Sequence, residues 1–473
     1  MDTLKKSDLA DRIAAIDDKG DKISYSELSD VWKDISSIIP RRKLVFSICS
    51  NTIGSMVGYT AFLKNDIVPL LLSSDLDRNL LESLLNTYKP AYIWIPSNRI
   101  KEFKGYKVKL NLYSYSLLKT NFEEGYELYE DLALLLTTSG STGSPKLVRQ
   151  SYKNILANTK SICQYLLIDE NERPITTLPM NYTYGLSIIN SHLYVGATIL
   201  LTDKSIMEKD FWDFFKVEKA TSFGGVPYTY EILNKLRFNK MELPSLKTMT
   251  QAGGKLSPEL HKKYAQYAEE NKIAFIVMYG QTEATARMAY LPKEMALEKY
   301  GSMGIPIPGG RFSLVDINNN EILKSNVVGE LKYYGENVTL GYAECGEDLA
   351  KGDDNKGVLV TGDMAKRDDD GYYYIVGRKK RFLKIFGNRV NLDEVERIIK
   401  GKFQTLDCAC TGVDDKMYIY ITDVAYLKEI RTYISQVTGL NIKAFQVKEI
   451  KVIPKNDAGK TLYKKLEELY NGI

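Results

Sequence analysis

In the middle of the chain, segments with the apolar pattern of strands alternate with segments that have the apolar pattern of helices. Segments 43–49, 67–72 and 132–138 are almost continuously apolar, as expected for strands buried on both faces of a parallel sheet. Residues 53–63 instead carry the pattern of a helix. Further strands are predicted at 175–178, 197–201, 220–224, 246–251 and 273–279, and further helices near 151–163, 208–217, 228–237 and 257–271. This alternation predicts an α/β fold with layered sheets.

The pattern changes in the last third of the chain. From 310 to about 375, short strands and turns predict a small β-rich subdomain. A basic, glycine-bracketed segment at 377–389 follows, and beyond it helices at 391–399 and 424–437 alternate with strands at 417–422 and 445–453. We therefore expect a large N-terminal domain, 1–378, and a small α+β C-terminal domain, 379–473, which is a normal domain size.

Charge and length exclude several classes of protein. A chain of 473 residues is too long for one ordinary core. The 64 Lys and Arg residues nearly balance the 60 Asp and Glu residues, so no nucleic-acid partner is expected. The first 22 residues are charged throughout, which argues against a signal peptide, and no apolar run is long enough to span a membrane. We expect a cytoplasmic protein.

Cysteine and histidine are too sparse for several kinds of chemistry. The five cysteines are scattered, which favours reduced thiols, and the pair Cys408 and Cys410 is expected to be buried rather than to bind a metal. Only two histidines are present, His192 and His261. Histidine acid–base catalysis and a multi-histidine metal site are therefore not expected.

Residues 137–146, Thr-Thr-Ser-Gly-Ser-Thr-Gly-Ser-Pro-Lys, combine features of a phosphate-binding loop. They lie between a predicted strand and a predicted helix. The glycines allow tight turns that expose backbone N–H groups, the hydroxyls add donors and Lys146 adds positive charge. The Walker spacing fails here, and it fails again at 459–461 because residue 454 is proline. A P-loop NTPase or kinase is therefore a distant alternative.

This loop resembles the phosphate-binding motif of the adenylate-forming superfamily, which contains acyl-CoA and aryl-CoA synthetases, adenylation domains of peptide synthetases, and luciferases. Other segments resemble the family's motifs in the same order, over about residues 20–465. They are Gln-Ala-Gly-Gly at 251–254, Tyr-Gly-Gln-Thr-Glu at 279–283, Gly-Ser-Met-Gly-Ile-Pro at 301–306, Thr-Gly-Asp at 361–363, Gly-Arg at 377–378 and the P-x-x-x-x-G-K segment at 454–460. Each match is weak alone, but together they are specific.

The resemblance implies roles for individual residues. Tyr279 would pack on adenine, Thr282 would contact the α-phosphate, and Glu283 would bind Mg²⁺, for which a carboxylate is a suitable ligand. Asp363 would accept hydrogen bonds from the ribose, with Arg378 nearby. The remaining residues expected to bind ATP or AMP are Thr138, Ser139, Gly140, Ser141, Thr142, Gly143, Lys146, Gly253, Gly254, Gly280 and Gln281.

The C-terminal domain would be mobile and would carry the catalytic Lys460. This lysine would stabilise charge between the attacking carboxylate and the α-phosphate, and rotation about the hinge residue Lys380 would withdraw it for the second step. For most of these positions an ordinary structural role, such as a core tyrosine, a turn aspartate or a surface lysine, is the alternative.

The implied activity is ATP-dependent activation of a carboxylic acid as acyl-AMP, followed by transfer to a thiol. The expected acyl pocket contains Tyr182, where many relatives have histidine, with Tyr184, Gly185 and Phe223. Amino-acid-activating members of the family usually carry an Asp just after this point, which holds the substrate's α-ammonium group. Residues 185–190, Gly-Leu-Ser-Ile-Ile-Asn, contain no acidic residue, which favours an acid without an α-amino group. The thiol is either CoA or the phosphopantetheine of a separate carrier protein. A stand-alone amino-acid adenylation enzyme and a non-catalytic nucleotide-binding relative remain alternatives.

Overall fold

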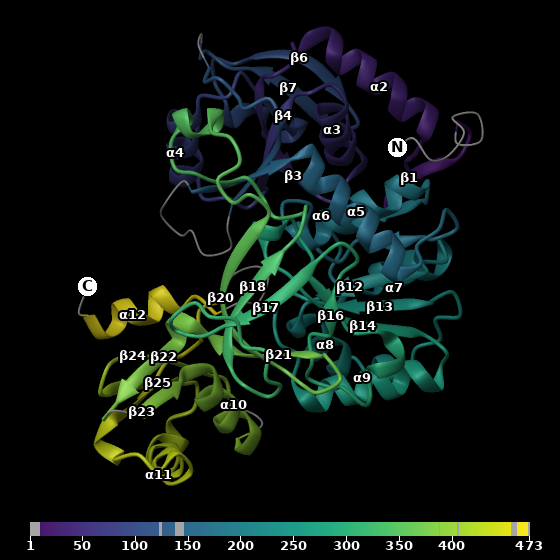
Figure 1. Cartoon of the computed structure of the whole chain (residues 1–473). Coiled ribbons are helices and arrows are strands. Elements are labelled where there is room, and N and C mark those ends of the chain that lie inside the picture. The colour runs from purple at the N-terminus through teal and green to yellow at the C-terminus, as the bar shows by residue number, and fades with distance from the viewer. Residues whose placement is uncertain are drawn as a thin grey trace. The chain divides into compact units, whose positions relative to one another are not determined.

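The computed structural model describes residues 10–122, 125–137, 146–386, 388–403, 406–455 and 461–471 (Figure 1). The chain divides into two compact units, Met1–Arg311 with Tyr333–Leu359, and Phe312–Lys332 with Val360–Ile473. These two units do not test the domain boundary after residue 378, which stays a prediction.

The first unit contains two layered sheets with parallel centres, as predicted. In one, β3, β4, β5 and β8 pair in parallel, and in the other β12, β13 and β14 do so. The first sheet has the order β6 (Lys107–Leu112), β7 (Tyr115–Lys119), β5 (Tyr92–Pro96), β3 (Leu44–Cys49), β4 (Val68–Ser73), β8 (Leu132–Thr137), β9 (Leu147–Ser151) and β19 (Gly341–Ala343). The second has the order β16 (Ile305–Pro306), β15 (Ala289–Tyr290), β14 (Ala274–Tyr279), β13 (Thr248–Gln251), β12 (Ser222–Gly225), β10 (Pro174–Ile175), β11 (Ile199–Leu201), β1 (Ile13–Asp17) and β2 (Lys22–Ser24).

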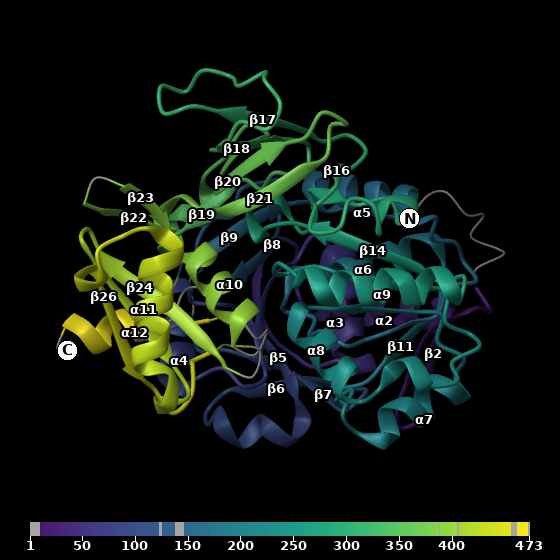
Figure 2. The ribbon, with the colours of Figure 1, turned by 90° about the horizontal axis from the view of Figure 1, so that it is seen from below.

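Helices cover both sheets. Helix α9 lies along β14 in both views (Figures 1 and 2), and Ser151 caps α5 by accepting a hydrogen bond from the Asn154 N–H, as its sequence position predicts. The helices of this unit are α2 (Tyr25–Ile38), α3 (Ile53–Lys64), α4 (Arg78–Tyr88), α5 (Tyr152–Leu166), α6 (Thr183–Val195), α7 (Lys209–Val217), α8 (Pro227–Lys235) and α9 (Pro258–Glu270).

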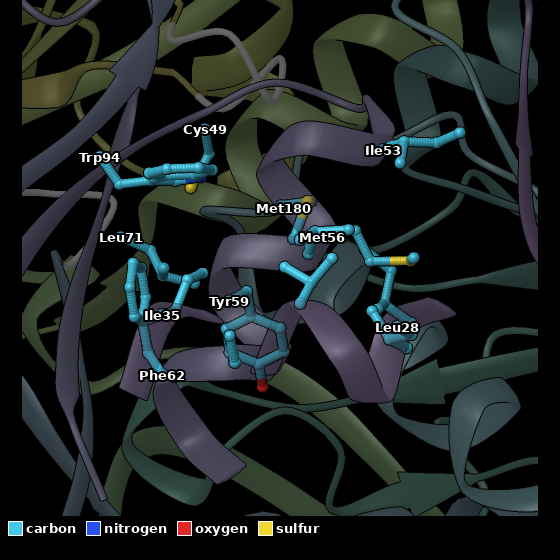
Figure 3. Packing of buried hydrophobic residues seen from close by; sticks show 14 of the residues in the cluster. Leu28, Ile35, Cys49, Ile53, Met56, Tyr59, Phe62, Leu71, Trp94 and Met180 are labelled. Atoms are coloured by element: carbon cyan, nitrogen blue, oxygen red, sulfur yellow. The ribbon is translucent and has the colours of Figure 1, made fainter. Parts of the chain in front are cut away.

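Helix α3 is the centre of the core. It contacts β3, β4 and β5 of one sheet and β1 of the other, and its side chains Met56, Tyr59 and Phe62 pack among residues from α2 and both sheets (Figure 3). A Cβ at Gly58 would lie 2.2 Å from the indole nitrogen of Trp94. The missing side chain therefore lets the buried Trp94 pack directly against the helix.

The second unit is built from smaller sheets. Helices α10 and α11 pack on β24 and β26, as predicted for an α+β domain. Cys408 and Cys410 are buried on β24, as expected. The elements are β17 (Arg311–Val315), β18 (Gly329–Tyr334), β20 (Val358–Arg367) and β21 (Tyr373–Arg378) in one sheet, the pair β22 (Phe382–Ile385) and β23 (Asn388–Asn391), the sheet of β24 (Cys408–Val413), β25 (Lys416–Ile421) and β26 (Phe445–Glu449), and the helices α10 (Leu392–Lys402), α11 (Leu427–Thr438) and α12 (Tyr463–Asn471).

Within the described ranges, no helix combines the length and the apolar character needed to cross a bilayer.

Candidate nucleotide and acyl site

The carboxyl ends of three neighbouring parallel strands define one edge of the second sheet. Gly225 on β12 pairs with Gln251 on β13, and Gln251 pairs with Val277 near the end of β14. The segments 252–254 and 280–283 therefore leave the sheet side by side. Ligands of open α/β sheets bind at such an edge.

Gly253 brings the expected adenine segment against the expected acyl pocket. Its φ is +82°, and a Cβ there would lie 2.5 Å from the Tyr182 hydroxyl. A side chain at this position would be both strained and obstructed. Beside it, Gly254 faces Pro227, which its Cβ would meet at 3.1 Å. The structure therefore places Tyr182 directly at the glycine pair that the sequence assigns to the nucleotide.

The segment after β14 folds back on itself tightly. A Cβ at Gly280 would lie 1.7 Å from the Ala286 carbonyl oxygen, so only glycine fits. Gln281 donates a hydrogen bond from Nε2 to the Tyr279 hydroxyl at 3.1 Å, and the 3-10 turn Thr282–Ala284 follows. Thr285 has a positive φ of 66°, which is unfavourable for a β-branched residue and marks a turn held by its surroundings.

Tyr342 connects the end of the phosphate loop with the Tyr-Gly-x-Thr-Glu segment. Its hydroxyl donates to Glu283 Oε1 at 2.7 Å, and the Lys146 ammonium lies 3.9 Å from its ring centroid. Burial, together with the Glu283 charge, raises the pKa of Tyr342, so the hydroxyl stays a donor. Lys146 also pairs with Glu344 at 3.2 Å. Two motifs far apart in sequence thus meet at one side chain that the sequence analysis did not identify.

Glu283 is suited to a magnesium ion that takes its other ligands from substrate and water. Only Oε1 of this carboxylate has a hydrogen-bond partner among the described residues. The described ranges also contain no group of three or more His, Cys, Asp or Glu side chains that could enclose a metal. A single carboxylate with an available oxygen fits Mg²⁺, which commonly keeps waters and binds substrate phosphates.

The expected acyl pocket lies where α6 begins. A Cβ at Gly185 would come within 2.5 Å of the Pro179 carbonyl oxygen, so glycine is required for this close approach. The Tyr184 hydroxyl lies 2.7 Å from Thr250 Oγ1 on β13, and its ring is 6.3 Å from the Tyr182 ring. Burial raises the pKa of Tyr182 to about 12, so it remains a phenol at neutral pH.

A cavity of about 30 Å³ lies next to this pocket. A buried water needs roughly 10–15 Å³, so the cavity has room for about two water molecules. It is lined by Phe223, another expected pocket residue, and among others by Gly224, Thr250, Ile188, His192 and Arg287. Phe223 itself is buried and packs edge-on against Phe238.

The remaining expected ligands lie in the second unit. Asp363 and Arg378 are paired across β20 and β21, and the Arg378 Nε lies 2.7 Å from Asp363 Oδ1. The Asp363 side chain is 4% exposed, whereas that of Arg378 is 59% exposed, so the arginine can reach outward. Their proximity agrees with the expectation that Arg378 lies near the ribose that Asp363 would bind. Lys380 follows in the 3-10 turn Lys379–Arg381.

Seven of the expected site residues lie outside the described ranges, so the structure does not test them. These are Thr138, Ser139, Gly140, Ser141, Thr142, Gly143 and Lys460.

A nucleotide-binding α/β protein is the class that this fold and strand edge indicate. The family model for AMP-binding enzymes matches residues 5–343. The chain belongs to this family and hence to the adenylate-forming superfamily, as the motifs predict.

Curated relatives and solved structures agree with this assignment. The chain is 27% identical to the 4-coumarate–CoA ligase-like 2 protein of Arabidopsis thaliana. The match covers 72% of this chain and only 62% of that relative. It is also 27% identical to the 2-succinylbenzoate–CoA ligase of Staphylococcus epidermidis, over 95% of this chain and 94% of the relative.

Two solved structures share the fold at 19% identity. One is o-succinylbenzoate CoA synthetase from Bacillus subtilis in complex with an acyl-adenylate intermediate, which covers 96% of this chain and 95% of its own, with a TM-score of 0.77. The other is ATP-bound MatB from Rhodopseudomonas palustris, which covers 99% and 97%, with a TM-score of 0.79. The predicted fold class is confirmed.

Proposed function

We propose that this chain converts a carboxylic acid and ATP into an acyl-adenylate and pyrophosphate, and then transfers the acyl group to a thiol. The observation that carries the proposal is the meeting of Lys146, Glu283 and Tyr342. In it, a cation from the phosphate loop and a potential metal ligand contact the same tyrosine side chain. The names of the relatives as CoA ligases, and of a structural neighbour as an acyl-adenylate complex, support the same chemistry.

In the first step, a carboxylate oxygen of the acid attacks the α-phosphorus of ATP. The bond to the bridging oxygen breaks, and pyrophosphate leaves with the electron pair. Because a carboxylic acid with a pKa near about 4 is already ionised at neutral pH, no general base is needed. The protein must position the groups and stabilise charge, which suits a chain with two buried histidines.

Different residues would position the acid and stabilise the charge of the phosphates. Tyr182, a phenol at the Gly253 strand end, would donate a hydrogen bond to the acid. Lys146 and, from the family resemblance, Thr282 and Lys460 would hold the phosphates. Mg²⁺, bound through Glu283, would supply neutralisation of phosphate charge.

In the second step, a thiolate attacks the carbonyl carbon of the acyl-adenylate. A sulfur–carbon bond forms, the carbon–oxygen bond to AMP breaks, and AMP leaves; the thiol proton goes to solvent. Withdrawal of Lys460 by rotation at Lys380 would open the way for the thiol. The acceptor is CoA or a carrier-bound phosphopantetheine. An acid without an α-amino group is favoured, because helix α6 contains no Asp or Glu to pair with an ammonium group.

ATP–pyrophosphate exchange with a panel of carboxylic acids tests the proposal. Exchange should depend on an acid and on Mg²⁺, and Glu283→Gln should lower it by about 100-fold, as removal of a charge-stabilising group does. The matched control is Glu259→Gln at an exposed position on α9, which should exchange like the parent.

Exchange driven only by α-amino acids would replace the proposed substrate class with that of an amino-acid adenylation enzyme. ATP binding without exchange for any acid would contradict the activity. Addition of CoA or a phosphopantetheinylated carrier to a competent reaction then identifies the acceptor through the thioester formed.

A further inference from the structure

Arg287 is a buried cation, and its partners among the described residues are all uncharged. Arg287 is 2% exposed to solvent. The guanidinium donates to Ser187 Oγ at 3.2 Å, to the Tyr165 hydroxyl at 3.2 Å and to Met278 Sδ at 3.1 Å, and it lies 5.0 Å from the Tyr184 ring centroid. No described carboxylate lies within ion-pair distance of it.

The other deeply buried arginine of this unit shows what a purely structural site provides. Arg149 is 0% exposed, yet it forms an ion pair with Asp354. Its remaining donors reach backbone carbonyl oxygens, namely those of Leu340, Tyr342, Lys351 and Gly352. Within the described part of the chain, Arg287 has neither a counter-charge nor a carbonyl acceptor for its guanidinium. Since burial of an unpaired charge is costly, its counter-charge is expected to come from a ligand.

The backbone of Arg287 is fixed by two asparagines. Asn158 Nδ2 donates to its carbonyl oxygen at 2.8 Å, and Asn337 Nδ2 donates to the same oxygen at 3.1 Å. The side chain therefore extends from a rigid support, and such preorganisation is what a recognition residue needs.

The guanidinium lines the 30 Å³ cavity beside the acyl pocket. Two other ionisable side chains line it. Burial lowers the pKa of His192 to about 4, so this imidazole is neutral. Glu172 lies 3.7 Å from the Lys247 ammonium and accepts a hydrogen bond from Thr221. The charge of Arg287 thus remains available to a group that enters the cavity.

Tyr182, Tyr184 and Arg287 connect the glycine pair at 253–254 with the cavity. Tyr182 touches Gly253, Tyr184 is the next ring, and Arg287 lies over Tyr184. An acid whose reacting carboxylate lies at Tyr182 would extend past Tyr184 toward Phe223 and Arg287. The far end of the substrate would therefore meet the guanidinium.

We propose that Arg287 is a specificity-determining residue that binds a second carboxylate, so that the acid activated by this enzyme is a dicarboxylic acid. A guanidinium can bind a carboxylate through two parallel hydrogen bonds, which selects for geometry as well as charge. The inference rests on the proposed adenylation activity, and it adds the chemical class of the substrate.

Pyrophosphate exchange with a series of linear diacids and their monomethyl esters tests this, because each ester keeps one reactive carboxylate and replaces the distal anion with a neutral methyl ester. For the diacid of best length, kcat/KM should exceed that of its ester by at least about tenfold (about 1.4 kcal/mol), mainly through KM. Arg287→Met should remove this preference, and Arg287→Lys should restore part of it. Thermal unfolding verifies that each variant is folded.

Arg99→Met is the matched control, because Arg99 pairs with Glu102 and does not line the cavity; it should keep the preference. Equal use of diacids and esters by the parent, or an unchanged preference in folded Arg287→Met, would overturn the inference while leaving adenylation intact. If Arg287→Met does not fold, Ser187→Ala, which removes one bond that orients the guanidinium, should weaken the preference, and an unchanged preference there would also overturn it. Absence of exchange with every acid would instead refute the proposed function.

Discussion

Individual side chains show where motif recognition ends. Gly253, Tyr279 and Glu283 were assigned from the sequence, because each lies in a short motif with a fixed spacing. Tyr342 and Arg287 were not, since their contacts join segments far apart in the chain and neither belongs to a recognised motif. A lone buried arginine has no local pattern that distinguishes it from one at the surface. The role proposed for Arg287 rests on its partners in the folded chain.

Replacing Gly253 by alanine should impair binding of the acid. Alanine at a φ of +82° costs about 1–2 kcal/mol of stability, and its Cβ would displace the Tyr182 hydroxyl. Gly20→Ala is the matched control, because Gly20 has a φ of +89° and nothing within 4 Å of the added Cβ. Both variants should unfold at lower temperature, but only Gly253→Ala should raise KM for the acid. Similar kinetics in the two variants would contradict the assignment of Tyr182.

Both histidines should make stability depend on pH. Burial lowers the pKa of His192 and of His261 to about 4 from 6.5. Below pH 6.5 the unfolded chain binds protons that the folded chain does not, so stability should fall as pH decreases from 6.5 toward 4. The slope is about 1.4 kcal/mol per pH unit for each histidine. Urea unfolding at pH 7 and pH 5.5 measures the difference in the free energy of unfolding between the two pH values. The same difference in His192→Asn as in the parent would contradict the account.

At the scale of elements, periodicity and capping predicted the strands β3, β4, β8, β11, β12, β13 and β14 and the helices α3, α5, α7, α8 and α9 of the α/β layers. Helices α2, α4 and α6 were not predicted. In α6, ten residues are buried and the segment lacks a polar face, so periodicity does not reveal it. The two-residue strands β15 and β16 are too short to give a pattern, and β10 ends at Ile175, whereas the predicted strand extends from 175 to 178. Strand β26 ends at Glu449, earlier than the predicted residue 453.

One cluster attaches the last helix to the predicted hinge. Arg381, next to Lys380, pairs with Asp393 at 2.8 Å and Glu396 at 2.6 Å, and lies 3.6 Å from the centroid of Tyr463 on α12. Tyr463 in turn donates to Glu396 Oε2 at 3.1 Å. Tyr463 follows the proposed catalytic residue Lys460 by three positions in the sequence.

Arg381→Met should therefore release α12. Removal of one partner from a buried ion pair costs about 3–5 kcal/mol, and amide hydrogen exchange of 463–471 should accelerate accordingly. Arg397→Met removes an exposed arginine that pairs with Glu394 on α10 and should leave that exchange unchanged. Equal protection of α12 in both variants would show that the cluster does not hold the helix.

For the whole molecule, the proposed mechanism requires the C-terminal domain to serve two half-reactions in turn. Lys380→Pro should slow thioester formation more than adenylation, because proline restricts the backbone rotation at the hinge. Single-turnover measurement of acyl-adenylate and thioester in the same variant gives both rates. Equal losses in the two half-reactions would argue against a hinge at this residue.

The central claim is that an oxygen of the substrate's own carboxylate attacks the α-phosphorus of ATP. Transfer of ¹⁸O from a doubly labelled acid tests it most directly, with the AMP released after thioester formation analysed by mass spectrometry. The account predicts one ¹⁸O atom in each AMP. Unlabelled AMP, or labelled inorganic phosphate released together with ADP, would contradict it.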